Sequence, residues 1–375
     1  MTGLYVHIPF CVRKCAYCDF YSVPDRLHLT EVYVDAVLRE AEAYAGLDFH
    51  SLYLGGGTPS LLGTHGLMRL VDGLCCTFGL SDLAEATMEV NPNSAGSDLL
   101  LAARDAGIDR LSIGVQSLSD PELQKVGRVH TAAQAADAVV RAVEVGFSSV
   151  SADVMVGLPG QRWATLRSTL VRLTELGVDH LSLYCLSLEE GTPLATNPPD
   201  DLPPDDVQAN LFEQATLFLE NRGFRQYEIS NFALPGCECR HNASCWRGGE
   251  YLGLGAAASS HLQGRRFKNA ADVEAYIRNP TGVVEEVEKL DARDKAAEEA
   301  MLRLRLVREG LVLQDLDRRF GRRNIDGLVR RLDDMVGDGQ LTFDGSAYRL
   351  PRSRVLTSNP ILARVLGEDH DENGR

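Results

Sequence analysis

One arrangement recurs between residues 4 and 224 of this chain: a short apolar run, a polar or glycine-rich loop, a helical pattern, and then a glycine followed by an apolar residue. We expect each of these glycines to end a helix, because glycine adopts the left-handed C-cap conformation without a side-chain penalty. Their spacing of 28 to 46 residues suits repeated βα units. The glycines are Gly46, Gly79, Gly107, Gly146, Gly177 and Gly223.

The apolar runs predict strands that are buried on both faces, because they are continuous rather than alternating. Such strands are typical of a parallel sheet covered by helices. Six βα units of this kind predict an α/β fold, a partial (β/α)6 barrel of the TIM type, with its active site at the carboxyl ends of the strands. The predicted strands are residues 4–8, 51–54, 87–90, 110–115, 150–156 and 181–186.

Reactive and polar residues lie in or just after the ends of five of these strands. A tight turn or a helix cap is the better explanation of any one of them alone, but because five adjacent strand ends carry them, we expect them to converge on one rim of the sheet. In chain order, they are Cys11, Cys15 and Cys18; Gly55, Gly56, Gly57 and Thr58; Glu89 and Asn91; Gln116 and Ser117; and Asp153.

The three cysteines after the first strand have the spacing C-x3-C-x2-C, which lets them share one metal centre. A four-iron cluster normally takes four cysteines, so a triplet leaves one iron open to another ligand. Zinc is the main alternative, with His7 or Asp19 as a fourth ligand. A disulfide is disfavoured, because no signal peptide is recognised and we expect a cytoplasmic protein.

Composition limits the partners of this chain. A formal charge of −15 argues against nucleic acid as the main partner, so any anionic ligand requires a local basic patch. No apolar run has the length of a membrane span, which leaves only peripheral membrane contact open.

The predicted domains are a βα barrel core at residues 1–200, a barrel extension at 201–290, a small helical domain at 291–365 and a disordered tail at 366–375. The extension contains a strand-like segment, RQYEISNFA. The small domain is expected to hold three helices and a hairpin turning at Asp344 and Gly345, which resembles a winged helix. Its arginines are interleaved with acids, which favours a solvated helix face over nucleic-acid binding.

Together, the cysteine triplet, GGGTP, MEVNP, GVQS, Arg128 and DVMVGLPGQ resemble the radical S-adenosylmethionine (SAM) proteins. More narrowly, they resemble the branch that contains oxygen-independent coproporphyrinogen dehydrogenase and the heme chaperone HemW. The resemblance implies a [4Fe-4S] cluster on Cys11, Cys15 and Cys18, in place of zinc, with SAM on the open iron. The residues it implies around SAM are Tyr5, Tyr17, Gly56, Gly57, Thr58, Glu89, Gln116, Arg128 and Asp153.

Three features favour the HemW side of this branch. The dehydrogenase has a further cysteine where this chain has Phe20, and it has a longer segment before its cluster motif. The third feature is RHNASCWRG, which resembles the HemW heme motif through His241, Asn242 and Trp246, with Cys245 in place of a tyrosine.

The chemistry of this motif stays open. A neutral imidazole is a good axial ligand for heme iron, and a Cys245 thiolate is an alternative. His241 is also compatible with a loop hydrogen bond, and Trp246 with a core position. Finally, a second metal site is compatible with four ligands of suitable chemistry, Cys237, Cys239, His241 and Cys245.

The sequence therefore predicts a heme chaperone that holds a [4Fe-4S] cluster and SAM and delivers heme to acceptor proteins, with respiratory proteins as the expected acceptors. The alternative function is a radical decarboxylation of coproporphyrinogen III to protoporphyrinogen IX. Whether the protein is an enzyme remains open at this point.

Overall fold

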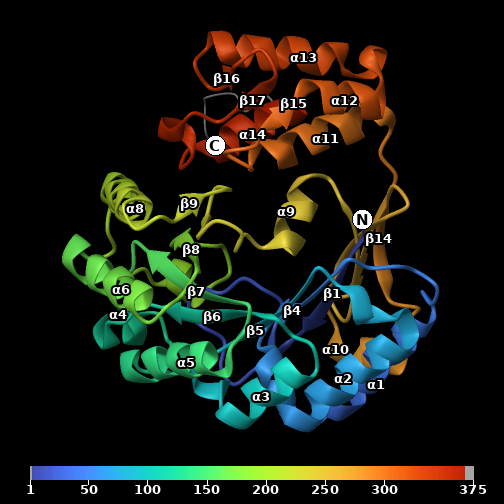
Figure 1. Ribbon diagram of the computed structural model, residues 1–375, viewed down its shortest axis with the longest axis vertical. Coiled ribbons are helices and arrows are strands. Elements are labelled where there is room, and N and C mark those ends of the chain that lie inside the picture. Colours follow the sequence, from blue (N-terminus) through green and yellow to red (C-terminus); the bar gives the residue numbers. More distant parts are fainter. Residues whose placement is uncertain (1, 368–375) are drawn as a thin grey trace.

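The computed structural model describes residues 2–367 of the protein, and its centre is a curved 12-stranded sheet (Figure 1). The strand order is β14-β13-β12-β11-β1-β4-β5-β6-β7-β8-β10-β9. In the described residues, β14 and β9 are the two edges, so the sheet is an open, partial barrel. Of the tail predicted at 366–375, residues 368–375 lie outside the described residues.

All six predicted strands are present, and each is parallel to its neighbour along the sheet. Most of their side chains are buried, as expected for a sheet covered on both faces, while Tyr184 and Cys185 at the end of the last strand are exposed. The strands are β1 (Thr2–Ile8), β4 (Ser51–Gly56), β5 (Glu85–Val90), β6 (Arg110–Gln116), β7 (Ser149–Val156) and β8 (His180–Cys185).

Helices cover the outer face of this sheet (Figure 1). The six predicted helix-ending glycines all have a positive φ, between 67° and 92°, which confirms the left-handed conformation at each. The helices of this part are α1 (Thr30–Glu42), α2 (Gly63–Phe78), α3 (Ser97–Asp105), α4 (Asp120–Lys125), α5 (Ala132–Val145), α6 (Trp163–Glu175), α7 (Pro193–Thr196) and α8 (Asp205–Glu220).

The segment after α8 extends the sheet at both of its sides. RQYEISNFA is not one strand, as predicted, but two short antiparallel strands, β9 (Arg225–Gln226) and β10 (Asn231–Ala233). The reason is a turn, in which the Glu228 carboxylate accepts a hydrogen bond from the Ser230 amide at 3.0 Å. Further along the chain, α9 (Arg240–Trp246) leads into β11 (Glu250–Leu254), which pairs in parallel with β1.

The remaining elements of the extension lie beyond β11. Three antiparallel strands follow one another to the sheet edge, and a short helix interrupts them. These elements are β12 (Ser259–Leu262), β13 (Arg265–Asn269), α10 (Val273–Arg278) and β14 (Val284–Glu288).

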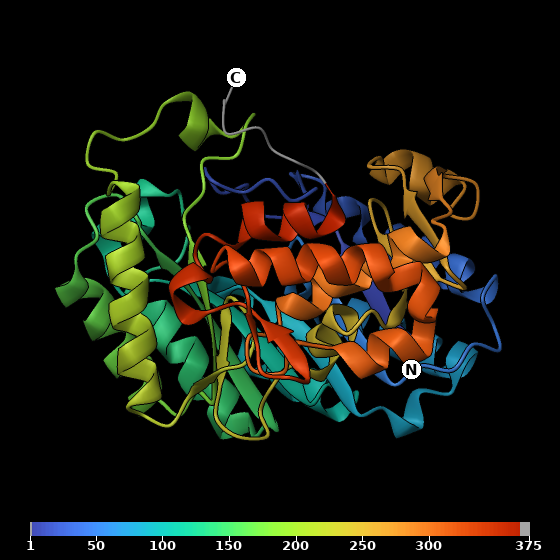
Figure 2. The ribbon, with the colours of Figure 1, turned by 90° about the horizontal axis from the view of Figure 1, so that it is seen from above.

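The C-terminal residues form a separate helical layer above the barrel (Figures 1 and 2). They have their own hydrophobic core and a three-stranded sheet in the order β15-β17-β16. The predicted winged-helix-like arrangement is present, including the hairpin at Asp344 and Gly345, but the structure adds a fourth helix after the hairpin. The elements are α11 (Ala292–Leu304), β15 (Leu311–Val312), α12 (Leu313–Phe320), α13 (Arg322–Gly337), β16 (Thr342–Phe343), β17 (Ala347–Arg349) and α14 (Ser358–Leu366).

Within residues 2–367, no helix combines the length and the apolar character needed to cross a bilayer.

Candidate cofactor site at the strand ends

A cavity of about 370 Å³ lies at the carboxyl ends of the parallel strands. It is the place where the sequence predicts that the strand-end residues converge. The predicted cluster and SAM residues that line it are Cys11, Cys15, Tyr17, Cys18, Gly56, Gly57, Thr58, Glu89, Gln116, Arg128 and Asp153. The structure therefore brings together residues that are up to 142 positions apart, from Cys11 to Asp153.

The cysteine loop is held at this rim by a two-stranded parallel pairing of β2 (Phe10–Cys11) with β3 (Val23–Pro24). All three cysteines are free thiols and partly buried. Burial is the main cause that raises the pKa of the Cys18 thiol.

A chain of polar contacts connects two of these thiols across the cavity wall. The Cys11 Sγ lies 3.6 Å from the Thr58 hydroxyl, and Asn91 Nδ2 donates to that hydroxyl at 2.8 Å. Arg128 donates from Nη2 to Asn91 Oδ1 at 2.7 Å, and from Nη1 to Cys15 Sγ at 3.4 Å. Arg128 Nε is buried and has no partner among residues 2–367. This network fixes the Arg128 guanidinium beside the Cys15 thiol.

Two glycines let the backbone approach the cysteine loop closely. A Cβ on Gly57 would lie 2.7 Å from the carbonyl oxygen of Phe10. A Cβ on Gly56 would lie 2.5 Å from the His7 ring, and the φ of Gly56 is +107°. Both positions therefore exclude any side chain.

Glu89 forms the floor of the cavity. Its carboxylate accepts a hydrogen bond from the Tyr53 hydroxyl at 2.8 Å and one from the Gly56 amide at 3.2 Å. Burial, with a contribution from the charge of Asp153, raises the pKa of Glu89 to about 7. Asp153 accepts from the Ser112 hydroxyl at 3.1 Å, and burial raises the pKa of this carboxyl too. A cationic group or a hydrogen-bond donor beside either carboxyl would therefore stabilise its ionised form.

Gln116 has an unusual backbone. Its φ is +65°, and the register between β6 and β7 shifts between Ile113 and Gln116. A left-handed residue other than glycine costs free energy and is often found at functional sites.

Tyr5 is the one predicted SAM residue that does not line the cavity. Its hydroxyl lies 2.9 Å from His7 Nδ1, and its ring centroid lies 6.2 Å from that of Tyr53. The sequence missed Tyr53 as a site residue. The available signal was its position two residues before Gly55 in β4, because alternate residues of a strand share a face.

The residues at this rim suit an iron–sulfur cluster. Among residues 2–367, no three His, Cys, Asp or Glu side chains gather around a single metal ion. A four-iron cluster does not require its cysteines to converge on one ion, since they ligate separate irons. Three free thiols on one loop, with a guanidinium beside one of them and an adjoining cavity, are compatible with such a cluster.

The predicted heme motif lies at the opposite, amino ends of the strands. Glu85, the first residue of β5, accepts hydrogen bonds from the backbone amides of Arg240 and His241 at 2.8 and 3.0 Å, and so holds the start of α9. The His241 side chain is 5% exposed, and its Nδ1 lies 2.9 Å from the hydroxyl of Ser51, the first residue of β4. Burial lowers the pKa of His241 to about 4, so its imidazole is neutral.

The other motif residues face different partners. The Trp246 ring lies under the Arg305 guanidinium at 4.4 Å, and its Nε1 is buried without a partner in the described residues. Burial raises the pKa of the Cys245 thiol to about 11. The Cys239 thiol donates at 3.3 Å to the Glu85 carboxylate, which also accepts from the His241 amide. Among residues 2–367, no three His, Cys, Asp or Glu side chains are placed to hold one metal ion, so the four possible ligands of a second metal are not gathered at one point.

Three cysteines on one loop, an adjoining polar cavity and an open parallel sheet are typical of a radical SAM protein, and residues 5–173 match the radical SAM superfamily. The fold is similar to the solved structure of coproporphyrinogen III oxidase (HemN) from Escherichia coli, with a TM-score of 0.82 and 23% identity, covering 98% of this chain and 89% of that chain. This likeness confirms the predicted fold class.

Several curated relatives carry the name heme chaperone HemW, among them the proteins of Escherichia coli and Lactococcus lactis. The Escherichia coli K12 protein is 34% identical over 379 residues, covering 98% of each chain. The Lactococcus lactis protein is 34% identical over 323 residues, covering 85% of each. The chain therefore belongs to the HemW family of radical SAM proteins, as its motifs predict. Membership in the superfamily implies the predicted [4Fe-4S] cluster and SAM.

Proposed function

We propose that this protein is a heme chaperone of the radical SAM type, which binds heme and passes it to acceptor proteins. The observation that carries the proposal is its 34% identity, over 98% of both chains, to a protein named heme chaperone HemW. The alternative, decarboxylation of coproporphyrinogen III, has the support of a likeness in fold alone. Respiratory proteins as acceptors, and a cytoplasmic location, belong to this proposal.

In this proposal, Cys11, Cys15 and Cys18 hold the [4Fe-4S] cluster. When bound, the reduced cluster supplies an electron for the sulfonium of SAM. Arg128 is suited to a carboxylate, because its guanidinium is fixed by Asn91 and the carbonyl of Gly114.

The other predicted SAM residues offer different kinds of contact to the cofactor. Glu89 and Asp153 are partly buried acceptors for amino and hydroxyl groups at the cavity wall. Gly56 and Gly57 line the cavity and offer backbone groups to the ligand, and Thr58 fixes the adjoining Cys11 thiol. Tyr5, Tyr17 and Gln116 complete the set as predicted neighbours of the cofactor.

The heme motif is the second part of the proposal, with His241 as an axial ligand and Asn242 and Trp246 beside the macrocycle. A neutral imidazole supports ligation. Because Ser51 contacts Nδ1 of this imidazole, ligation through that atom requires α9 to move. Tyr53 joins the two sites, since its ring centroid lies 5.2 Å from that of His241 and its hydroxyl contacts Glu89.

The proposal is tested by titrating the purified protein with heme and then adding an apo-protein that requires heme. We expect a saturable heme complex, followed by transfer of the heme absorption bands to the acceptor. His241→Ala is expected to alter the heme spectrum, with Cys245→Ser as a companion variant that tests thiolate ligation. An absence of saturable heme binding by the unaltered protein contradicts the proposed function, and unchanged spectra in both variants remove the motif from it.

A further inference from the structure

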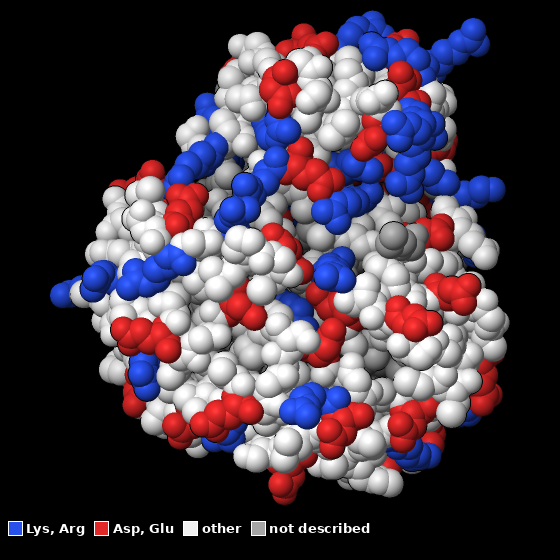
Figure 3. Space-filling view, viewed as in Figure 1, with Lys and Arg blue, Asp and Glu red and all other residues white. Residues whose placement is uncertain are grey.

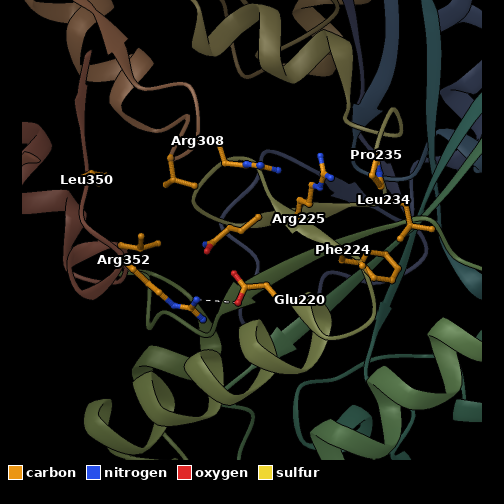
Figure 4. Close-up of a pocket in the computed structure, with 12 residues that line it drawn as sticks. Glu220, Phe224, Arg225, Leu234, Pro235, Arg308, Leu350 and Arg352 are labelled. Carbon is orange, nitrogen blue, oxygen red and sulfur yellow. Dashed lines mark hydrogen bonds and ion pairs between the residues drawn. The ribbon is translucent and has the colours of Figure 1, made fainter. Parts of the chain in front are cut away.

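A second cavity, of about 700 Å³, lies between the barrel and the C-terminal helical domain (Figure 4). One wall comes from the end of α8 and the β9–β10 segment, and the other comes from the loop after α11 and the chain that follows β17. We call this cavity the interdomain cleft. Its apolar lining consists of Phe224, Leu234, Pro235, Val307, Leu350 and Val355.

Three arginines also line the interdomain cleft, and two of them lack an acidic partner. Arg352 forms an ion pair with Glu220 at 2.9 Å. Among the ion pairs of residues 2–367, none involves Arg225 or Arg308, whose side chains extend from opposite walls into the space between them (Figure 4). Along the surface where the two domains meet, Lys and Arg side chains are interspersed with Asp and Glu (Figure 3). In a chain with a net charge of −15, Arg225 and Arg308 therefore stand out as two cations of one cleft that have no ion pair among residues 2–367.

The volume and the lining residues of the interdomain cleft indicate which class of ligand it suits. Small-molecule sites are typically about 300–1,000 Å³ in volume, with apolar linings and a few polar groups that fix orientation. Guanidinium groups bind carboxylates through paired, charge-assisted hydrogen bonds. The cleft therefore suits a large apolar molecule that carries two carboxylates. Its lining contains no His, Cys, Met or Tyr, so recognition would not depend on a metal at the centre of the ligand.

One loop connects this cleft to the heme motif. Arg305 covers the Trp246 ring at 4.4 Å, and Glu309 pairs with Arg247 at 2.8 Å, so both ends of the loop contact the end of α9. Between them, Val307 and Arg308 line the cleft. A ligand in the cleft would therefore touch the same loop that holds Trp246.

We propose that the interdomain cleft is a porphyrin-binding site, in which Arg225 and Arg308 bind the two propionates and the apolar lining contacts the ring. This inference rests on the proposed function, because it assigns a site to the cargo of the chaperone. It differs from the heme motif in requiring no ligand to the iron.

The test uses metal-free protoporphyrin IX and its dimethyl ester as probes, with fluorescence as the readout. We expect the unaltered protein to bind the free acid at least about tenfold more tightly than the ester, because the ester lacks both charges. The double variant Arg225→Glu/Arg308→Glu is expected to lose this preference. The matched control is Arg293→Glu/Arg323→Glu, which makes the same charge change at exposed positions outside the cleft and is expected to keep it.

A filling variant, Val307→Trp, tests the apolar part while both arginines remain, and it is expected to weaken binding of the free acid. Circular dichroism and thermal unfolding of each variant show that the fold is retained. If the unaltered protein binds heme but the double variant and its control bind protoporphyrin IX equally well, the cleft assignment is overturned and the proposed function stands. If the unaltered protein binds neither heme nor protoporphyrin IX, both are overturned.

Discussion

Glu89 gives the sharpest prediction about the SAM site, because its ionisation falls near neutral pH. Burial raises the pKa of this carboxyl to about 7, and Asp153 adds to the shift. The carboxyl is therefore mostly neutral below pH 7 and mostly ionised above it. Only the ionised form accepts hydrogen bonds with both oxygens from an amino group. Replacing Glu89 with Gln removes the titration while keeping the shape.

The size of the effect follows from that pKa. With a pKa of about 7, roughly one carboxyl in eleven is ionised at pH 6 and roughly ten in eleven at pH 8. If SAM requires the ionised form, its apparent dissociation constant is about tenfold larger at pH 6 than at pH 8.

Calorimetric titration of the cluster-loaded protein with SAM, under anaerobic conditions from pH 6 to pH 8, measures this change. The amino group of SAM titrates equally for both proteins, so the difference between the unaltered protein and Glu89→Gln isolates the carboxyl. We expect weaker binding and a flatter pH profile for the variant. If the SAM dissociation constant changed equally with pH in the unaltered protein and in Glu89→Gln, the reasoning would be refuted.

Three further predictions concern the cluster, the SAM carboxylate and the core. Cys11→Ser is expected to abolish nearly all iron binding after anaerobic reconstitution, whereas Cys75→Ser, at an exposed cysteine of α2, keeps the iron content. Arg128→Lys is expected to weaken SAM binding about tenfold in the same calorimetric titration, because lysine lacks the planar fork that fits a carboxylate. Tyr276→Phe removes a hydrogen bond to the buried Glu40 carboxyl, whose pKa burial raises to about 7. The Tyr276 hydrogen bond favours the ionised form of Glu40, so its loss raises the pKa of Glu40 further and costs most stability where Glu40 is ionised, above about pH 7. Urea unfolding should therefore show a loss of about 1.5–3 kcal/mol at pH 8 and a smaller loss at pH 5. Equal iron content in the two cysteine variants would contradict the first expectation, and an unchanged SAM affinity of Arg128→Lys would contradict the second. A loss of unfolding free energy in Tyr276→Phe that is the same at pH 5 and pH 8 would contradict the third.

The barrel was predictable because its signals are local. Continuous apolar runs mark strands buried on both faces, and glycines such as Gly79 and Gly146 end their helices directly in the left-handed conformation. Once strands are known to be parallel, their carboxyl ends share one edge, so residues as distant as Cys11 and Asp153 are predicted to meet. Spacing alone leaves zinc open, and the family resemblance favours the cluster.

Other parts depend on contacts that local sequence does not reveal. The hydroxyl of Tyr53 reaches Glu89 because the register of β4 and β5 pairs Tyr53 with Thr87, two residues before Glu89. The heme motif sits at the amino ends of the strands because Glu85 holds the backbone amides at the start of α9. RQYEISNFA has apolar and aromatic residues typical of a strand, but the side chain of Glu228 stabilises a turn within it.

In the proposed function, this protein carries heme and does not convert a porphyrin precursor. The most direct test is an anaerobic assay of the reconstituted, heme-free protein with coproporphyrinogen III, SAM and a reductant, in which protoporphyrinogen IX is counted per protein molecule. We predict no multiple-turnover formation of product. Sustained product formation over many turnovers would contradict the assignment as a chaperone and establish a decarboxylating enzyme instead.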